Sequence, residues 1–380
     1  MRTSQGEQTV STTGRMALGV LAGSVLAWAL SGSVQPTPTP SRTWARDSQE
    51  SNWVKAEARY LRNIRQLTYD FERAGEAYFS PDMRYIVFQA EEKGENPFYQ
   101  IYVMELASGR RWRVSPGVGR TTCAYFHPSV EKLIFASTHL DPEARKKQQE
   151  ELARRAQEAS QGKPRRYEWA FDPYFDIFEC RLDGTGLRRL TDTPGYDAEG
   201  SYSPDGKQIV FCSARSGDLQ LYIMDSDGRN VRQLTRAPGC YNGGPFFSPD
   251  GRRVIFRADR KKKDYLQIFV INADGTGEEQ LTDTEGVNWG PYCHPHGRHI
   301  IYAAADHSHP TLRPNYDLWL MEVATRKKVR ITYAPGADVL PVFSPDGKKL
   351  MWTSTRDGKL PGAQIFLADF HMPAESEFQP

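Results

Sequence analysis

Ser203-Pro204-Asp205-Gly206, with the apolar triplet Ile209-Val210-Phe211 behind it, is one copy of a pattern that recurs along most of this 380-residue chain. Each copy predicts a tight hairpin, because proline presets φ in a turn, Asp bonds locally to the backbone and glycine adopts a left-handed conformation. Met83 and Val130 stand in place of that glycine in two copies, so we expect those turns to be strained or differently shaped. The six turns begin at Ser80, His127, Ser203, Ser248, His294 and Ser344.

Two further markers accompany each turn, and the first of them keeps a nearly constant distance from it. An aliphatic residue followed by a hydroxyl residue, as in Leu190-Thr191, precedes the turn by 13 residues in five copies and by 14 in one. A third apolar strand that opens on a polar residue, as in Gln220-Leu221-Tyr222, follows the turn, and Asp-Gly turns lead into a fourth strand. Turn-to-turn spacings of 47, 76, 45, 46 and 50 residues suit the four-stranded blades of a propeller, with an insertion in the longest.

The repeats therefore predict an all-β fold, a six-bladed β-propeller of four-stranded antiparallel blades over residues 61–370, followed by a tail over 371–380. The last unit stops at its third strand, Gln364–Phe370, whereas Leu67-Thr68 has no blade in front of it. We expect Arg62–Thr68 to pair as the outer strand of the sixth blade, which would remove an exposed sheet edge. An open array or a separate N-terminal cap is the alternative.

Composition restricts the classes of function. Forty-nine basic and 47 acidic residues leave a formal charge of +2, which lacks the one-signed field of a typical nucleic-acid binder, so no nucleic-acid partner is predicted. The five cysteines show no metal-binding spacing, and an odd number cannot close a disulfide framework, so we expect mostly buried small hydrophobes.

Residues 1–35 have the layout of a signal peptide or a membrane anchor. Arg2 and Arg15 precede the uncharged stretch Met16–Leu30, and small residues follow it. If this segment is retained, Met16–Val34 approaches the length needed to span a bilayer. A Pro/Thr-rich linker and a short helix are expected over 36–60. The sequence thus predicts a periplasmic or exported protein, tethered to the inner membrane if the segment is not cleaved.

The insertion covers residues 139–173 in the second blade. Asp141-Pro142 is typical of a helix start, and Glu143–Gln161 predicts a helix with few apolar positions that projects or lies loosely on the disc. We expect the aromatic residues behind it to pack the insertion onto its own blade, the alternative being that they cover the central channel or contact a partner. They are Tyr167, Trp169, Phe171, Tyr174 and Phe175.

Candidate site residues gather on the face opposite the SPDG turns. Polar side chains six residues before a turn could ring the channel mouth and bind Ca²⁺ through oxygen atoms, or could simply cap loops locally. They are Asp197, Asn242, Asn288 and Asp338, with Glu76 and Glu199 two residues further along their strands.

The loops between second and third strands supply the other candidates. Their arginines could receive an anionic polymer or an acidic partner surface, or form a solvated rim. Three histidines could ligate a transition metal, although they lack a compact spacing and could equally be solvated; no other cofactor is predicted. The arginines are Arg215, Arg257, Arg260 and Arg356, and the histidines are His139, His307 and His309.

These repeats resemble those of the TolB-type β-propeller family, through the SPDG hairpins, third strands such as Gln100-Ile101-Tyr102 and the closing Leu-Thr pair, from about Leu61 to Phe370. The resemblance implies a non-enzymatic, usually periplasmic module that binds a protein partner or a cell-wall or glycan component; we expect a monomeric propeller. Residues 41–60 leave no room for the N-terminal domain of TolB itself. Oligogalacturonate lyases have similar repeats and a histidine-coordinated metal, so the alternative is a metal-assisted polysaccharide lyase.

Overall fold

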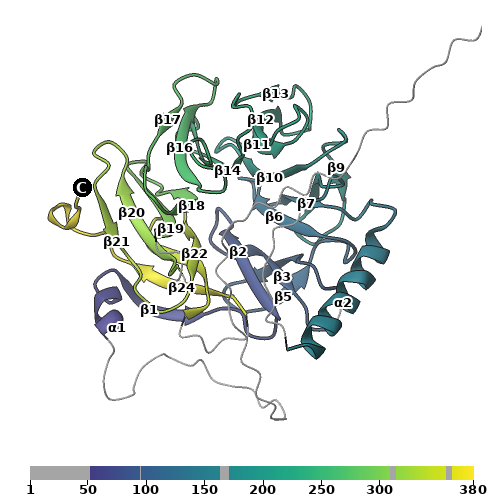
Figure 1. The fold of residues 1–380 in the computed structure, drawn as a ribbon, viewed down its shortest axis with the longest axis horizontal. Helices are drawn as coiled ribbons and strands as arrows, with labels where there is room; N and C mark the ends of the chain where they lie inside the picture. The colour runs from purple at the N-terminus through teal and green to yellow at the C-terminus, as the bar shows by residue number, and fades with distance from the viewer. Residues whose placement is uncertain (1–51, 95, 163–170, 309–313, 357–361) are drawn as a thin grey trace, which may run out of the picture.

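The computed structural model describes residues 52–94, 96–162, 171–308, 314–356 and 362–380. Within these ranges six four-stranded antiparallel sheets surround one central axis (Figure 1), so the predicted six-bladed propeller is confirmed. The expected signal or anchor over 1–35 lies outside the described residues, as do Tyr167, Trp169 and His309. None of the helices in the described ranges is long and apolar enough to cross a membrane.

Each blade runs from an innermost to an outermost strand. The first blade holds β2 (Arg73–Phe79), β3 (Tyr85–Glu91), β4 (Gln100–Glu105) and β5 (Arg111–Arg113). The second holds β6 (Thr121–Phe126), β7 (Lys132–Ser137), β8 (Asp176–Arg181) and β9 (Arg188–Arg189). The third holds β10 (Asp197–Tyr202), β11 (Gln208–Ser213), β12 (Gln220–Asp225) and β13 (Arg232–Gln233).

The second half of the disc repeats this order. The fourth blade holds β14 (Asn242–Phe247), β15 (Arg253–Ala258), β16 (Gln267–Asn272) and β17 (Glu279–Gln280). The fifth holds β18 (Val287–Cys293), β19 (His299–Ala305), β20 (Asp317–Glu322) and β21 (Lys328–Arg330). The sixth holds β22 (Asp338–Phe343), β23 (Lys349–Ser354), β24 (Gln364–Phe370) and, from the other end of the chain, β1 (Leu61–Gln66). The described helices are α1 (Asn52–Glu57), α2 (Ala144–Ser160) and the 3-10 helix η2 (Glu375–Glu377).

The ring is closed by the expected pairing of β1 with β24. Leu61 stands opposite Phe370 and Gln66 opposite Phe366 in an antiparallel register. The strand order of this sheet is β1-β24-β23-β22, so the sixth blade takes its outermost strand from the start of the propeller. The latch thereby pairs the free edge of β24, which would otherwise be open to another strand.

One hydrogen bond explains why the hydroxyl residue of each Leu-Thr pair recurs. In the third blade the backbone N–H of Leu221, the second residue of β12, donates to Thr235 Oγ1 at 2.9 Å. The same bond occurs in every blade and spans the latch in the sixth, where Ile365 N–H donates to Thr68 Oγ1 at 3.0 Å. The hydroxyl satisfies a buried donor where the outermost strand ends, and so fixes the spacing between the two markers.

The SPDG turns have the expected geometry. Asp205 Oδ1 accepts a hydrogen bond from the N–H of Lys207 at 3.1 Å, and Gly206 has a φ of 71°. Met83 and Val130 have φ values of 59° and 68°, so the two variant turns keep the left-handed shape without the glycine that adopts it freely. These turns are strained, as expected, and the β-branched Val130 is the less compatible of the two.

Every innermost strand contains a bulge at the same position. Pairing between the first and second strands shifts register there in all six blades. The residue four places before each turn has a positive φ, between 47° and 60°. These residues are Glu76, Cys123, Glu199, Gly244, Gly290 and Leu340. A bulge changes the direction of a side chain, so the side chain at this position points differently from those of the regular strand around it.

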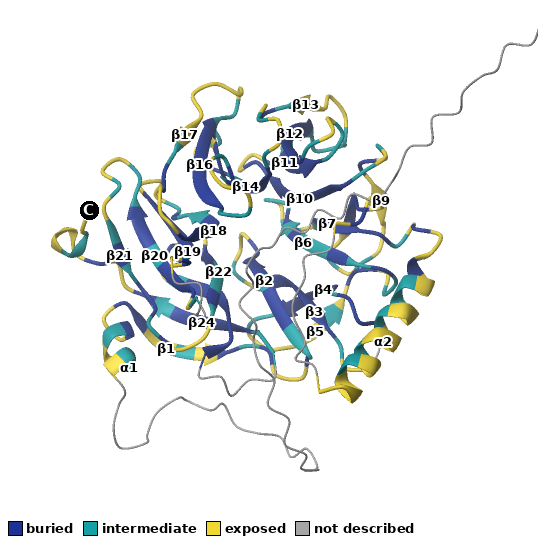
Figure 2. Cartoon of the chain, viewed as in Figure 1, coloured by how far each residue is buried: buried dark blue, intermediate teal, exposed yellow. Residues whose placement is uncertain are grey.

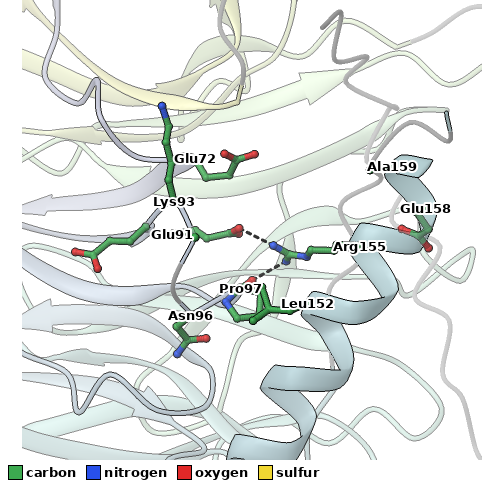
Figure 3. Close-up of a pocket in the computed structure, with 11 residues that line it drawn as sticks. Glu72, Glu91, Lys93, Asn96, Pro97, Leu152, Arg155, Glu158 and Ala159 are labelled. Carbon is green, nitrogen blue, oxygen red and sulfur yellow. Dashed lines mark hydrogen bonds and ion pairs between the residues drawn. The ribbon is translucent and has the colours of Figure 1, made fainter. Parts of the chain in front are cut away.

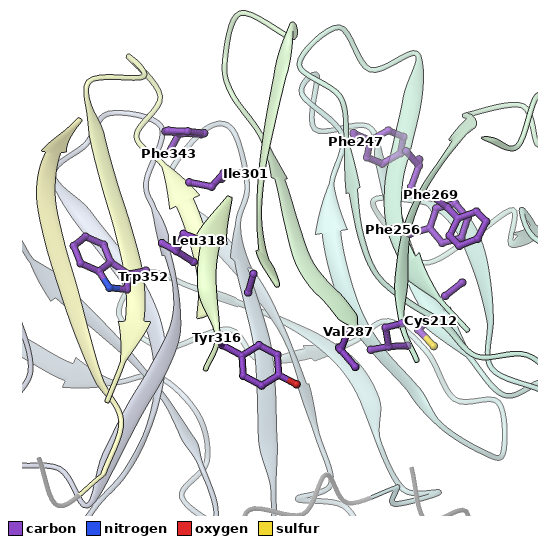
Figure 4. Packing of buried hydrophobic residues seen from close by; sticks show 14 of the residues in the cluster. Cys212, Phe247, Phe256, Phe269, Val287, Ile301, Tyr316, Leu318, Phe343 and Trp352 are labelled. Atoms are coloured by element: carbon purple, nitrogen blue, oxygen red, sulfur yellow. The ribbon is translucent and has the colours of Figure 1, made fainter. Parts of the chain in front are cut away.

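The core lies within and between the blades. Buried second and third strands run through every blade (Figure 2), and large rings such as Phe256, Phe269 and Trp352 fill the space around them (Figure 4). Phe256 and Phe269 stack at 5.7 Å between ring centroids. All five cysteines are free; Cys180 and Cys212 are buried as expected, whereas the other three are only partly buried.

The insertion forms the expected helix, but it does not pack on its own blade alone. Arg155 of α2 donates to Glu91 Oε1 and to the Pro97 carbonyl of the first blade, both at 2.6 Å. Figure 3 shows these bonds beside a cavity of about 270 Å³ between α2 and the loop after β3. The expectation of a loosely lying helix is therefore wrong, because a charged residue on a polar helix ties it to the neighbouring blade.

Candidate functional site

Antiparallel strand order gives the disc two different faces. The SPDG turns lie on one face, here called the turn face. The loops from second to third strands and from fourth strands to the next blade lie on the other, here called the loop face. Each innermost strand starts at the loop face and runs toward the turn face, so residue position along it gives depth along the axis.

Four aromatic rings fill the axis toward the turn face. Each ring belongs to the residue that stands two positions before a turn, and the four come from different blades. They are Tyr78, Tyr125, Phe246 and Tyr292. Ring centroids of Tyr78 and Tyr125 are 5.1 Å apart, and those of Phe246 and Tyr292 are 5.2 Å apart. The hydroxyls of Tyr125 and Tyr292, from the second and fifth blades, lie 3.2 Å apart. This aromatic plug joins opposite blades and blocks the axis.

Nearer the loop face, five side chains form the axial cluster, namely Glu76, Cys123, Glu199, Tyr241 and Arg257. Glu199 is its centre and is 5% exposed. Its carboxylate accepts from Arg257 Nη2 at 2.9 Å and from the Tyr241 hydroxyl at 3.0 Å. The bulge at Glu199 thus turns an acid from the third blade onto an arginine and a tyrosine of the fourth.

Two glycines make room for this arrangement. A Cβ on Gly243 would lie 1.9 Å from the Tyr241 hydroxyl, and one on Gly244 would lie 2.2 Å from Arg257 Nη1. The N–H of Gly244 also donates to Glu199 Oε2 at 2.5 Å. Close backbone approach at these positions is a use to which only glycine is suited.

Burial perturbs the ionisation of the cluster. It raises the pKa of Glu76 to about 7, against lowering contributions from hydrogen bonding to Cys123 and from the charge of Arg257. Burial, together with the Glu76 and Glu199 charges, raises the pKa of the Cys123 thiol well above its usual value. Burial opposes the charge of Arg257, but Tyr241 and Glu199 outweigh it and raise the pKa of the guanidinium. Near neutral pH the cluster therefore holds a charged arginine, a protonated thiol and one acid that exchanges its proton.

The residues expected to ring the channel mouth do not do so. Asp197 accepts from Arg215 at 2.9 Å, and Asp338 accepts from the Trp352 indole at 3.0 Å. Asn242 donates to the Leu219 carbonyl and Asn288 to Gln267 Oε1. These four side chains thus face into or between blades, whereas the bulge two residues further along turns Glu76 and Glu199 to the axis. These bonds span 14 to 23 residues of sequence, so the four side chains tie strands of one blade or of neighbouring blades together and do not act as local caps.

The four candidate arginines are neither free nor solvated. Their side chains are 16%, 15%, 16% and 5% exposed at Arg215, Arg257, Arg260 and Arg356, and each pairs with a carboxylate of this chain. Arg257 lies in β15 rather than in the loop after it. Among the predicted site residues that the structure describes, only Glu76, Glu199 and Arg257 come together at the axis.

Arg356 has a second partner that the sequence did not reveal. Its Nη1 lies 3.2 Å from Glu57 Oε2, and its Nη2 donates to Asp338 at 3.0 Å. Glu57, from α1, is 1% exposed and also accepts from the N–H groups of Tyr333 and Ala334. Burial raises the pKa of Glu57, while Arg356 opposes that shift. No repeat or motif contains Glu57, so it gave no signal.

The two candidate histidines that the structure describes belong to different blades and make separate contacts. His139 in the second blade contacts Ser137 Oγ at 2.8 Å, and His307 in the fifth contacts the Tyr316 hydroxyl at 3.0 Å. Across the described ranges, no three His, Cys, Asp or Glu side chains gather closely enough to hold a metal ion. Burial lowers the pKa of both histidines, consistent with neutral rings in structural contacts.

Sequence reasoning missed the aromatic plug and Tyr241. A signal for the plug was available, because its four rings occupy the same place before their turns. Tyr241 and its counterpart Tyr196 directly precede innermost strands, and the hydroxyl of Tyr196 donates to Glu199 at 3.1 Å. The repeat pattern does not predict the strand bulge, and only the bulge brings Glu199 within reach of both hydroxyls.

The fold and its axis define a closed six-bladed β-propeller with a plugged centre. Residues 172–314 match the family described as the TolB beta propeller domain. The protein is a TolB-like β-propeller. One curated relative, the Protein TolB homolog of Chlorobium chlorochromatii, is 34% identical over 157 residues, which are 41% of this chain and 33% of that protein. The matches cover between 33% and 41% of the curated relatives' own length.

Solved structures agree on the fold. A putative TolB from Agrobacterium tumefaciens aligns with a TM-score of 0.55 at 19% identity, covering 79% of this chain and 91% of the other. An oligogalacturonate lyase in complex with manganese aligns with a TM-score of 0.51 at 17% identity, covering 82% and 80%. At these identities the likeness concerns the fold.

Proposed function

We propose that this protein is a non-enzymatic binding module of the bacterial cell envelope and that it captures a protein partner on the loop face. One observation carries the proposal: the axis is blocked by the aromatic plug on the turn side and holds a charged, partly accessible cluster on the loop side. Arg257 is 15% exposed although the blades surround it. A partner segment would approach this cluster from the loop face.

The insertion extends this face. Phe171 stacks on Tyr196 with 5.6 Å between ring centroids, and the Tyr196 hydroxyl reaches Glu199. Leu140, Phe171 and Tyr174 are 53%, 41% and 46% exposed. Exposed aromatic and aliphatic side chains beside a polar centre are typical of protein-binding surfaces.

Location in the envelope rests on the N-terminal sequence and on the TolB-like relationship. Arg2 and Arg15 before an uncharged stretch favour export, and the Tol-Pal system protein TolB of Wolinella succinogenes matches 46% of this chain at 27% identity. The lyase alternative rests on a fold likeness alone, and His139 and His307 are engaged in separate contacts.

Cross-linked affinity capture from an envelope extract tests the proposal. We expect Leu140→Ser with Tyr174→Ser to reduce capture of a specific protein several-fold, because both side chains project from the loop face. The matched control is Leu187→Ser with Val231→Ser, which removes two similarly exposed side chains, 40% and 39%, from the turn face. Equal loss in both pairs, or loss only in the turn-face pair, would contradict the proposed surface.

A further inference from the structure

Arg257 offers hydrogen-bond donors that this chain does not use. Its Nη2 donates to Glu199 and to Tyr241, both at 2.9 Å. Within the described residues, its Nε and Nη1 make no hydrogen bond. A guanidinium presents its donors as a planar fork that suits a carboxylate, so a half-used fork at a partly accessible position is a receptor for one.

A second unused donor lies beside the first. The indole Nε1 of Trp289 is buried and has no hydrogen-bond partner among the described residues. The guanidinium carbon of Arg257 is 5.8 Å from the centroid of the Trp289 ring. Buried polar groups are nearly always hydrogen-bonded, so this donor is available to an acceptor from outside the chain, and its place beside Arg257 distinguishes it from other buried donors.

We propose that Arg257 and Trp289 bind a carboxylate group of the protein partner at the axial cluster. This inference rests on the proposed function and specifies the chemistry of its site. The carboxylate would be that of an acidic side chain or of a chain end in the segment that approaches from the loop face. Glu199 keeps Arg257 charged and oriented, and so acts as a positioning residue.

The cluster favours a single carboxylate over an acidic sugar. Glu199 already accepts from Tyr196, Tyr241, Gly244 and Arg257. In the axis below, the hydroxyls of the aromatic plug already have partners, because Tyr78 donates to Glu76 at 3.3 Å and those of Tyr125 and Tyr292 lie 3.2 Å apart, so they offer little to a sugar's hydroxyls. Several hydroxyls buried there would lack partners, and each would cost free energy.

Glu76 links the binding to pH. Its neighbours are Cys123, Tyr78, Arg257 and Glu199, and its pKa is about 7. The charges of Glu199 and Arg257 offset each other, so an added carboxylate leaves one excess negative charge beside Glu76. Binding would therefore favour the protonated form of Glu76, and affinity would fall as pH rises through 7 and above.

The test uses the full chain and the peptide probes acetyl-Gly-Gly-Glu-amide and acetyl-Gly-Gly-Gln-amide. The indole N–H signal of Trp289, assigned with Trp289→Phe, is followed by ¹H–¹⁵N NMR. We expect a saturable shift with the glutamate peptide and none with its glutamine analogue. Arg257→Lys should weaken the glutamate peptide roughly tenfold or more, because a point charge replaces the fork. The matched control Arg215→Lys, which changes another carboxylate-paired arginine, should leave it unchanged.

The outcomes are distinct. Equal shifts with both peptides, or full affinity in Arg257→Lys, overturn the inference. A shift with trigalacturonate but not with the glutamate peptide overturns it in favour of a glycan ligand. If Arg257→Lys does not fold, Trp289→Phe decides by calorimetry: it should weaken the glutamate peptide several-fold, and full affinity overturns the inference. In the parent protein, an affinity that does not fall as pH rises through 7 overturns the coupling to Glu76. Failure of all probes while loop-face capture of a partner persists rejects this site and leaves the proposed function standing.

Discussion

Arg356 and Arg257 carry the same ion-pair chemistry in different surroundings. Arg356 is 5% exposed, lies between Asp338 and Glu57, and has its guanidinium over the Trp352 ring at 5.1 Å. Arg257 is 15% exposed and bonds one carboxylate through a single nitrogen. Through its pairs with Glu57 of α1 and Asp338 of β22, Arg356 holds α1 against the sixth blade. The difference separates an arginine whose role is internal from one that keeps donors for an outside group.

Removing Arg356 should have the largest effect on stability. In Arg356→Ala, Asp338 and Glu57 remain buried at 1% exposure without their cation. Breaking a buried pair in this way costs about 3–5 kcal/mol, because the desolvated charge stays behind. Urea unfolding followed by circular dichroism measures the change. Arg260→Ala is the control, since its partner Glu278 is 34% exposed, and should cost no more than about 1 kcal/mol.

The equivalent change at Arg257 should cost less. In Arg257→Ala, Glu199 retains hydrogen bonds from Tyr196, Tyr241 and the N–H of Gly244. These donors continue to satisfy the acid, so we expect a loss of about 1–3 kcal/mol in the same unfolding measurement. A loss as large as that of Arg356→Ala would mean that Arg257 is a structural arginine too, and the comparison would fail.

The same contrast shows which features a sequence can predict. Repeated features were predictable, because six copies reveal a spacing: the blades, the SPDG turns and the pairing of β1 with β24 followed from it. Arg215 pairs with Asp197 and Arg356 with Asp338 at the same separation of 18 residues, so this pairing was also available in principle. Glu57 was not, because it belongs to no repeat and meets Arg356 only through the folding of α1 onto the disc.

The axial cluster was only half predictable. Glu76 and Glu199 stood out because they share a position before their turns. Their convergence with Arg257 depends on bulges and on Gly243-Gly244, which set side-chain direction without changing the repeat length. A regular strand reading therefore placed Asp197 and Asp338 at the axis, one bulge away from the residues that lie there.

Glu76 differs from both arginines in the sign of the expected effect, because its substitution should stabilise the protein. Burial raises its pKa to about 7 from an ordinary value of 4.5, so the folded state binds a proton that the unfolded state has released between these values. Stability contributed by this group is therefore lost as pH rises from 4.5 to 7, and Glu76→Gln should remove that loss. We expect the variant to be more stable than the parent at pH 8 by up to about 3 kcal/mol and nearly equal to it near pH 4.5, by thermal unfolding at the two pH values.

Glu179 provides the opposite case in the same experiment. Burial opposes its charge, but hydrogen bonds from Lys132 and Tyr202 outweigh burial and lower its pKa. Its stabilising contribution is present above the ordinary glutamate pKa and is lost as pH falls through the lowered value. Glu179→Gln should accordingly destabilise the protein at pH 8, where Glu76→Gln stabilises it. If both variants shift stability in the same direction at pH 8, Glu76 behaves as an ordinary buried carboxylate beside Arg257. Nothing then distinguishes it from the carboxylates of the internal ion pairs.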